Sequence, residues 1–60
     1  MRLKLGSRIK HIKTRTEYTV IGLGKCKVGS DWKECATYEN RKREQFTRER
    51  DDFQGFVILA

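Results

Sequence analysis

The chain has 60 residues, of which 37% are apolar and 37% are charged, and its net charge is +6. A chain of this length forms one domain and buries only about 60% of its unfolded surface. These values exclude an enclosed substrate pocket of the usual enzyme size, and they place nearly every large apolar side chain in the core.

Alternating apolar and polar side chains predict two strands in the first half of the chain. Residues 8–14, "RIKHIKT", predict a short strand with Ile9 and His11 on one face, and "RTE" at 15–17 follows as a polar turn. Residues 18–28, "YTVIGLGKCKV", predict a longer strand. One face of that strand is expected to carry Tyr18, Val20, Gly22, Gly24, Cys26 and Val28. Two glycines on this face predict a bent or bulged strand, as a small barrel needs at a corner.

The second half predicts three more strands separated by polar turns. "GSD" at 29–31 is typical of a turn, and "WKECATYE" at 32–39 predicts a strand. One face of this strand is expected to carry Trp32, Glu34, Ala36 and Tyr38. Beyond the polar residues 40–44, "QFTR" and "GFVIL" predict two short strands, with "ERDDF" as a tight turn between them.

A helix over residues 40–52 is the alternative for the middle of this half, because the segment is rich in good helix formers. The only apolar residues of the stretch 39–53 are Phe46 and Phe53. Two isolated apolar residues do not form the apolar stripe of a helix that packs on a core. A hairpin followed by a turn is therefore favoured.

Five short strands in about fifty residues predict a mainly β domain that spans residues 1–60. So little chain cannot form two packed sheets, so the strands are expected to curl into a small, partly open barrel. Phe46, Phe53 and Phe56 are expected in its core. Arg48 shares a face with Phe46 and is expected to pair inward with a carboxylate such as Asp51 or Asp52.

Three stretches of the chain resemble a family of small bacterial and phage domains of unknown function. These are "EYTVIG" at 17–22, "WKECATYE" at 32–39 and "FTRERDDFQGF" at 46–56, and the likeness spans residues 8–58. They match the family's Tyr-x-Val-x-Gly, its Val-x-Tyr strand, its aromatic-x-Arg-Pro turn and its acidic-Phe pair before Gly-Phe. Glu49 stands where the family has Pro, and Ala36 where it has Val. The resemblance implies an SH3-like small barrel of the kind found in phage genomes, and it implies no reaction.

The two cysteines, Cys26 and Cys35, do not form a CxxC motif, and His11 is the only histidine. A zinc site would therefore lack ligands, and no metal is expected. No apolar run is long enough for a transmembrane helix or a signal peptide, so no membrane partner is expected. We expect a cytoplasmic, reducing location, which the resemblance places in a bacterial host cell. Both thiols are then expected to be free and buried as small hydrophobic groups.

No grouping of residues predicts catalysis. Ser7 and Ser30 have no nearby base, and "GLGKCKVGS" lacks the end of a phosphate-binding loop and the helix that should follow it. The pair Asp51 and Asp52 is more typical of a capped turn than of a cation site. The chain is therefore not expected to be an enzyme or to hold a cofactor.

The basic residues are the feature of the sequence that indicates a function. Residues 1–33 carry a net charge of +7, whereas residues 34–60 carry −1. A concentrated positive charge favours polyanions, above all nucleic acid, although solubility alone also requires net charge. The candidate phosphate-binding residues are Lys10, Lys13, Arg15, Lys25, Lys27, Arg41, Lys42 and Arg43.

Trp32 and Tyr38 are the candidates for stacking on bases. A chain with so few large side chains is expected to need Trp32 in its core, whereas Tyr38 is expected to be half-exposed with its hydroxyl in water. The sequence thus predicts a small phage-type accessory module that binds nucleic acid through a basic surface, with Tyr38 as its aromatic contact. The alternative is an adaptor that binds a host or phage protein.

Overall fold

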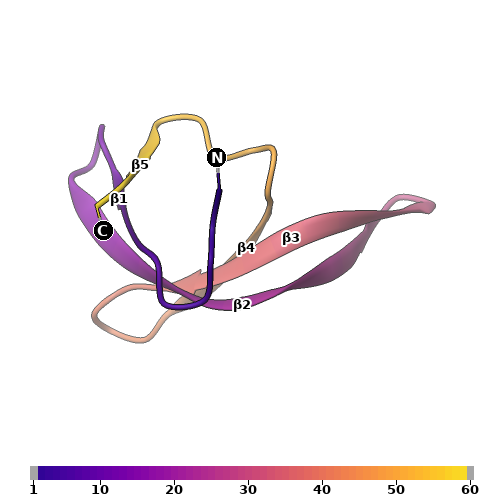
Figure 1. Cartoon of the computed structure of the whole chain (residues 1–60), viewed down its shortest axis with the longest axis horizontal. Coiled ribbons are helices and arrows are strands. Elements are labelled where there is room, and N and C mark those ends of the chain that lie inside the picture. Colours follow the sequence, from indigo (N-terminus) through magenta and orange to yellow (C-terminus); the bar gives the residue numbers. More distant parts are fainter. Residues whose placement is uncertain (1, 60) are drawn as a thin grey trace.

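The computed structural model describes residues 2–59 and contains a single antiparallel sheet in the order β4-β3-β2-β1-β5 (Figure 1). Its strands are β1 (Arg8–His11), β2 (Thr16–Val28), β3 (Asp31–Glu39), β4 (Gln45–Glu49) and β5 (Phe56–Ile58). The sheet curls around one core without closing, and β4 and β5 are its two edges. The predicted mainly β, five-stranded, partly open barrel is confirmed.

Helices are absent from residues 2–59, so the alternative helix over 40–52 is wrong. In its place Asn40–Glu44 form a turn, β4 follows, and a second turn begins at Arg50, as the scarcity of apolar residues predicts. It follows that the part of the chain described by the structure has no helix long and apolar enough to cross a membrane.

The core lies on the concave face of the curled sheet and combines side chains from the strands, from the N-terminal segment and from the turn between β4 and β5. Its members are Leu3, Ile9, Val20, Ala36, Tyr38, Phe53 and Phe56. The rings of Phe53 and Phe56 meet edge to face with 5.2 Å between their centroids, and Phe53 lies 5.6 Å from Tyr38. The predicted core positions of Phe53 and Phe56 are confirmed.

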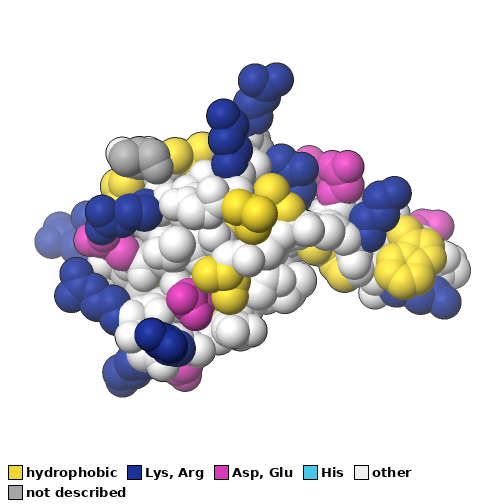
Figure 2. All heavy atoms as spheres, turned by 60° about the horizontal axis from the view of Figure 1, so that its bottom comes forward, with side chains coloured by type: hydrophobic (Ala, Val, Ile, Leu, Met, Phe, Trp, Pro, Cys, Tyr) yellow, Lys and Arg dark blue, Asp and Glu magenta, His cyan; other side chains and the backbone are white. Residues whose placement is uncertain are grey.

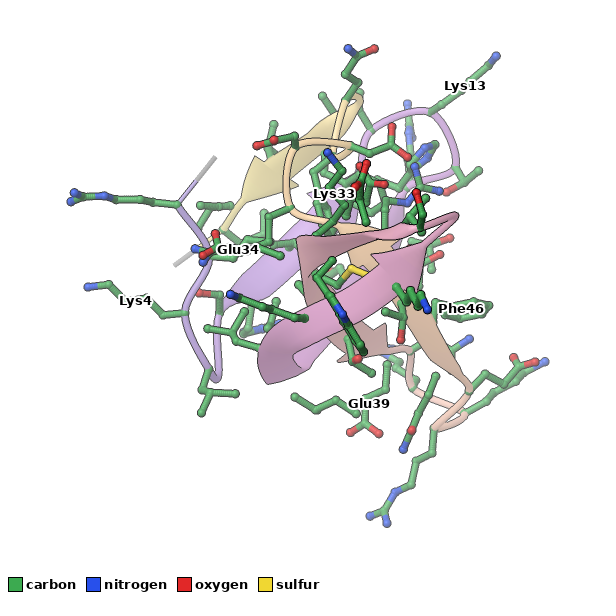
Figure 3. All side chains as sticks on the ribbon, turned by 90° about the vertical axis from the view of Figure 1, so that its right-hand side faces the viewer. Lys4, Lys13, Lys33, Glu34, Glu39 and Phe46 are labelled. Carbon is green, nitrogen blue, oxygen red and sulfur yellow. A yellow bond between two sulfur atoms is a disulfide. The ribbon has the colours of Figure 1, made fainter. Side chains whose placement is uncertain are left out.

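The predicted core position of Phe46 is wrong, because its side chain is 42% exposed. Phe46 lies on the edge strand β4 opposite Tyr38, and its ring contacts Tyr38 and Tyr18 at centroid distances of 5.7 and 6.1 Å. Strand β4 has no neighbouring strand on its other side, so the Phe46 ring lies at an open edge of the sheet (Figure 3). Phe46 thus covers the rim of the core rather than filling its centre.

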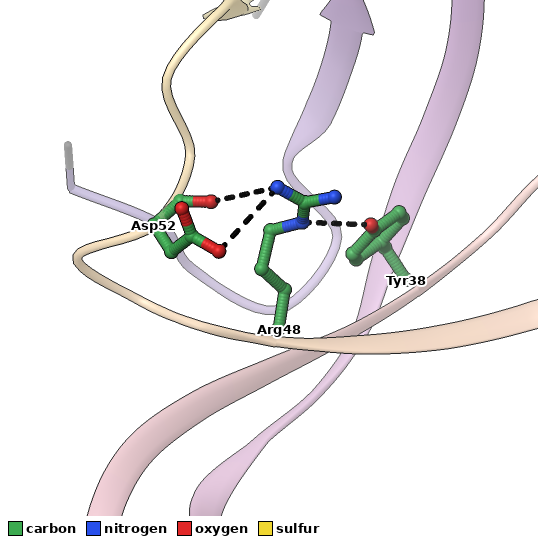
Figure 4. Close-up of polar contacts among 3 residues, drawn as sticks. All are labelled: Tyr38, Arg48 and Asp52. Atoms are coloured by element: carbon green, nitrogen blue, oxygen red, sulfur yellow. Dashed lines mark hydrogen bonds and ion pairs between the residues drawn. The ribbon is translucent and has the colours of Figure 1, made fainter.

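Arg48 lies between Tyr38 and the turn that follows β4 (Figure 4). Its Nε donates to the Tyr38 hydroxyl at 3.4 Å, and one of its terminal nitrogens donates to the Asp52 carbonyl at 3.1 Å. The same nitrogen lies 3.5 Å from the Asp52 carboxylate, which confirms Asp52 as the predicted partner, although this carboxylate is exposed and does not lie inside the core. The guanidinium also lies 5.5 Å from the ring centroid of Phe56, so it connects β4 to β5 across the gap.

A β-bulge interrupts β2 between Val20 and Gly22 and changes which residues share a face. Val20 is opposite Tyr38, but beyond the extra residue Leu23 is opposite Ala36. The predicted bulge is confirmed, whereas the predicted face is wrong beyond Val20. Leu23 and the lysines after it continue the face of Tyr18 and Val20, while the glycines and Cys26 lie on the opposite face.

The far end of the β2–β3 hairpin projects beyond the rest of the sheet (Figure 1). Strand β1 pairs with β2 only over Thr16–Thr19, and β4 pairs with β3 only over Cys35–Glu39. Residues 25–34 therefore form a two-stranded ribbon with no third strand beside it, which we call the arm. Its turn consists of Gly29 and Ser30, and Gly29 has the positive φ of 64° that such a turn requires.

A disulfide joins Cys26 to Cys35 at the root of the arm, with 6.0 Å between their Cα atoms. The prediction of two free thiols is therefore wrong. Cys26 is opposite Lys33, so Cys35, two residues further along β3, lies diagonally across on the same face. The prediction of free thiols followed from an assumed reducing compartment and not from this geometry.

Candidate nucleic-acid interface

The predicted basic residues lie in two groups at opposite ends of β2. One group surrounds the β1–β2 and β3–β4 turns, and the other, Lys25 and Lys27, lies on the arm. Thr16 and Lys25 are nine residues apart on β2, or about 30 Å of extended strand. The two groups are therefore separate surfaces and not one continuous patch.

The two turns approach each other and form an open cleft of about 400 Å³, which we call the turn cleft. One wall comes from residues 15–17 and the other from residues 40–44. The lining residues are Arg15, Thr16, Glu17, Asn40, Arg41, Lys42 and Glu44. The fold thus brings together two basic segments that are about 25 residues apart in the sequence.

The β1–β2 turn is held by hydrogen bonds around His11. The backbone N–H of Arg15 donates to the His11 carbonyl at 2.8 Å, and that of Thr14 donates to His11 Nδ1 at 3.3 Å. Arg15 itself has a φ of 58°, a left-handed conformation that these bonds maintain. Lys13 is exposed at this turn and points away from the sheet (Figure 3), and Lys10 precedes it on β1, opposite Glu17.

Asn40 organises the β3–β4 turn. Its Oδ1 accepts hydrogen bonds from the backbone N–H groups of Lys42 at 2.9 Å and Glu44 at 3.0 Å. Its Nδ2 donates to the Glu44 carboxylate at 3.0 Å. The Asn40 side chain therefore satisfies the turn backbone. Arg41, Lys42 and Arg43 are left exposed, and none of them forms an ion pair within residues 2–59.

The charge of the turn cleft is positive, although two acidic residues line it. Glu17 is bound by Arg8 at 2.9 Å, and Glu44 accepts the Asn40 hydrogen bond. The other ion pairs found in residues 2–59, Arg48–Asp52 and Arg50–Glu34, involve none of the cleft's cations. Within that part of the chain, the basic side chains of the cleft that have no acidic partner within 4 Å are Arg15, Arg41 and Lys42. In Figure 2, basic side chains gather at the end of the molecule opposite the arm.

Tyr38 does not belong to this surface. It is only 5% exposed, and its hydroxyl accepts a hydrogen bond from Arg48. Its ring is surrounded by other aromatic rings, namely those of Tyr18, Phe46, Phe53 and Phe56. The predicted half-exposed position is wrong, because Tyr38 fills the centre of the core and has no free face for a base to stack on.

Trp32 is a further aromatic residue that the sequence interpretation misplaces. The sequence predicts it in the core, but it is 66% exposed on the arm, opposite Lys27. Its position immediately after the "GSD" turn is the signal that could have indicated this exposure. A residue next to a hairpin turn lies at the tip of the strand, where a third strand and a core cover it only if the neighbours are equally long.

Comparison with models of known protein families, with curated proteins and with solved structures finds no significant match for this chain. The functional conclusions below therefore depend on the positions and charges of its own residues.

Proposed function

We propose that this chain is a small, non-catalytic, phage-type accessory module that binds nucleic acid through the phosphates. The observation that carries the proposal is the turn cleft, which Arg15, Arg41 and Lys42 line without forming an ion pair to any described residue. Such a cleft suits a chain of phosphates better than a protein surface, because its three cations outnumber its two carboxylates and one of these, Glu17, is paired with Arg8.

Contact in this cleft is expected to be independent of base sequence. Guanidinium groups such as those of Arg15 and Arg41 form paired hydrogen bonds to phosphate oxygens, and these contacts fix position without reading bases. Lys13 and Arg43, on the outer sides of the two turns, extend the positive surface to neighbouring phosphates. Each phosphate neutralised releases condensed counterions, so binding must weaken as salt is raised.

The variants Arg15→Gln and Arg41→Gln test the proposal, since glutamine keeps a long side chain and removes the charge. Each is expected to weaken binding to every duplex sequence tested, and to lower the slope of log affinity against log salt by about 0.9 for each phosphate that is no longer neutralised. Fluorescence anisotropy of a labelled duplex at several salt concentrations measures both effects. Lys4→Gln is the matched control, because Lys4 is exposed outside the cleft and the change in net charge is the same.

An equal weakening by Lys4→Gln and by the cleft variants would show that only net charge matters. If the unmodified chain binds neither DNA nor RNA at low salt, the proposal is rejected. The protein-adaptor alternative then takes its place, and the edge strand β5 favours it, because Val57 and Ile58 are partly exposed there.

A further inference from the structure

The arm carries an exposed aromatic ring beside two lysines. Trp32 is directly opposite Lys27, and the next pair on the same face is Glu34 opposite Lys25. Lys25 and Lys27 are two residues apart on β2, so their Cα atoms are about 6.6 Å apart and their side chains leave the strand in parallel. In Figure 2 the projecting end of the molecule shows hydrophobic atoms next to basic ones.

The acidic residues of the arm do not cancel this positive charge. Arg50 pairs with Glu34 at 3.7 Å and donates to the Leu3 carbonyl at 3.2 Å, so it engages Glu34 from the body of the domain. Asp31 is opposite Val28 on the other face of the arm. The face that carries Trp32 therefore keeps the charges of Lys25 and Lys27.

The indole ring is free to accept a partner. The aromatic contacts and the cation–π contact found in residues 2–59 involve other rings, so neither a ring nor a guanidinium of that part of the chain stacks on Trp32. A two-stranded ribbon alone is only marginally ordered in water. Here the Cys26–Cys35 disulfide clamps the root of the ribbon and so holds Trp32 on a defined platform.

We propose that the arm binds unpaired bases of single-stranded nucleic acid, with Trp32 stacking on a base and Lys25 and Lys27 contacting the flanking phosphates. This rests on the proposed function in taking nucleic acid as the partner. A base in a duplex has both faces covered by its neighbours, so an indole can stack only where the strand is unpaired. A purely apolar partner does not match the two lysines, whereas a polyanion with flat rings matches both features.

Trp32 is the only tryptophan of the chain, so its fluorescence reports on the arm alone. A short oligothymidine is expected to quench this fluorescence, whereas a short duplex of the same length is expected to bind with little quenching. Binding itself is followed independently by the anisotropy of a label on each oligonucleotide. This comparison uses the unmodified chain and needs no variant to fold.

The variant Trp32→Ala is expected to weaken oligothymidine binding roughly 5- to 150-fold and to leave duplex binding unchanged. Trp32→Phe, which keeps a ring, is expected to restore most of the affinity. Val28→Ala is the matched control, because it removes apolar atoms from the opposite face of the same arm. The absence of quenching, or an equal effect of Trp32→Ala on single strands and duplex, overturns the proposal.

The same titrations separate this inference from the proposed function. If duplex binding depends on Arg15 and Arg41 but oligothymidine does not quench Trp32, the proposal for the arm is rejected and the proposal for the turn cleft stands. Quenching by oligothymidine, together with duplex binding that Arg15→Gln and Arg41→Gln do not weaken, supports the arm and removes the cleft. If no nucleic acid binds, both proposals are rejected.

Discussion

Replacement of Phe53 by alanine is expected to remove much of the protein's free energy of unfolding. Phe53 is 4% exposed and packs edge to face on Tyr38 and Phe56. Removing a buried phenylalanine ring costs about 3–5 kcal/mol, because burial is reduced and a cavity remains. The whole free energy of unfolding of a 60-residue domain is roughly 3–9 kcal/mol, so this cost is a large part of it.

Phe46→Ala is the matched control, because it deletes the same ring from the rim of the core. Since Phe46 is 42% exposed, we expect the free energy of unfolding to fall by only about 1–2 kcal/mol. Urea unfolding should be followed by far-UV circular dichroism, because the exposed Trp32 is a poor reporter of the core. Equal unfolding midpoints for the two variants would contradict the assignment of Phe53 to the core and Phe46 to its rim.

Loss of the Cys26–Cys35 disulfide is expected to cost about 2.5–3 kcal/mol, because the bond closes a ten-residue loop and so restricts the unfolded chain. The double replacement by serine and the addition of a reductant to the unmodified chain should lower the unfolding midpoint by similar amounts. Hydrogen exchange is expected to rise first in the arm, which has no third strand.

Adding reductant to the double serine variant controls for effects of the reductant itself, and it should change nothing. Thiol labelling of the unmodified, unreduced chain gives a second check. If both cysteines react with the label, or if the reductant leaves the midpoint of the unmodified chain in place, the bond does not form in solution.

The strands could be predicted from the sequence because the patterns that produce them are local. Alternation in "WKECATYE" fixes which residues of β3 share a face, and the turn residues Gly29 and Ser30 end the strand before it. The bulge after Val20 could be anticipated from the glycines, but its exact place could not. One extra residue shifts the alternation, so Leu23 and not Gly22 faces the side of Val20.

The misplaced aromatic residues share a different cause, which is the unequal length of neighbouring strands. Burial of Trp32 required β1 and β4 to reach as far as the arm, and both end well before it. Tyr38 lies where β3 is paired with β2 on one side and with β4 on the other, so Tyr38 is buried and Trp32 is not. Strand lengths in space depend on pairing between distant segments, which periodicity along a single strand does not contain.

The turn cleft was only half predictable. The exposure of Lys42 and its neighbours follows from a polar turn between two strands, and the sequence shows this directly. That this turn lies beside Arg15 is a product of the sheet order and curvature. The engagement of Glu17 by Arg8 is also non-local, and it offsets one of the two negative charges that line the cleft.

The disulfide makes the outer part of the arm a covalently closed ring that runs from Cys26 to Cys35. Trypsin cleaves after lysine, and two of the exposed lysines, Lys27 and Lys33, lie inside this ring. A cut after either one adds a water molecule, but the two pieces stay joined through the sulfur atoms. The nicked protein therefore keeps Trp32 attached to the body of the domain, and its fragments separate only after reduction.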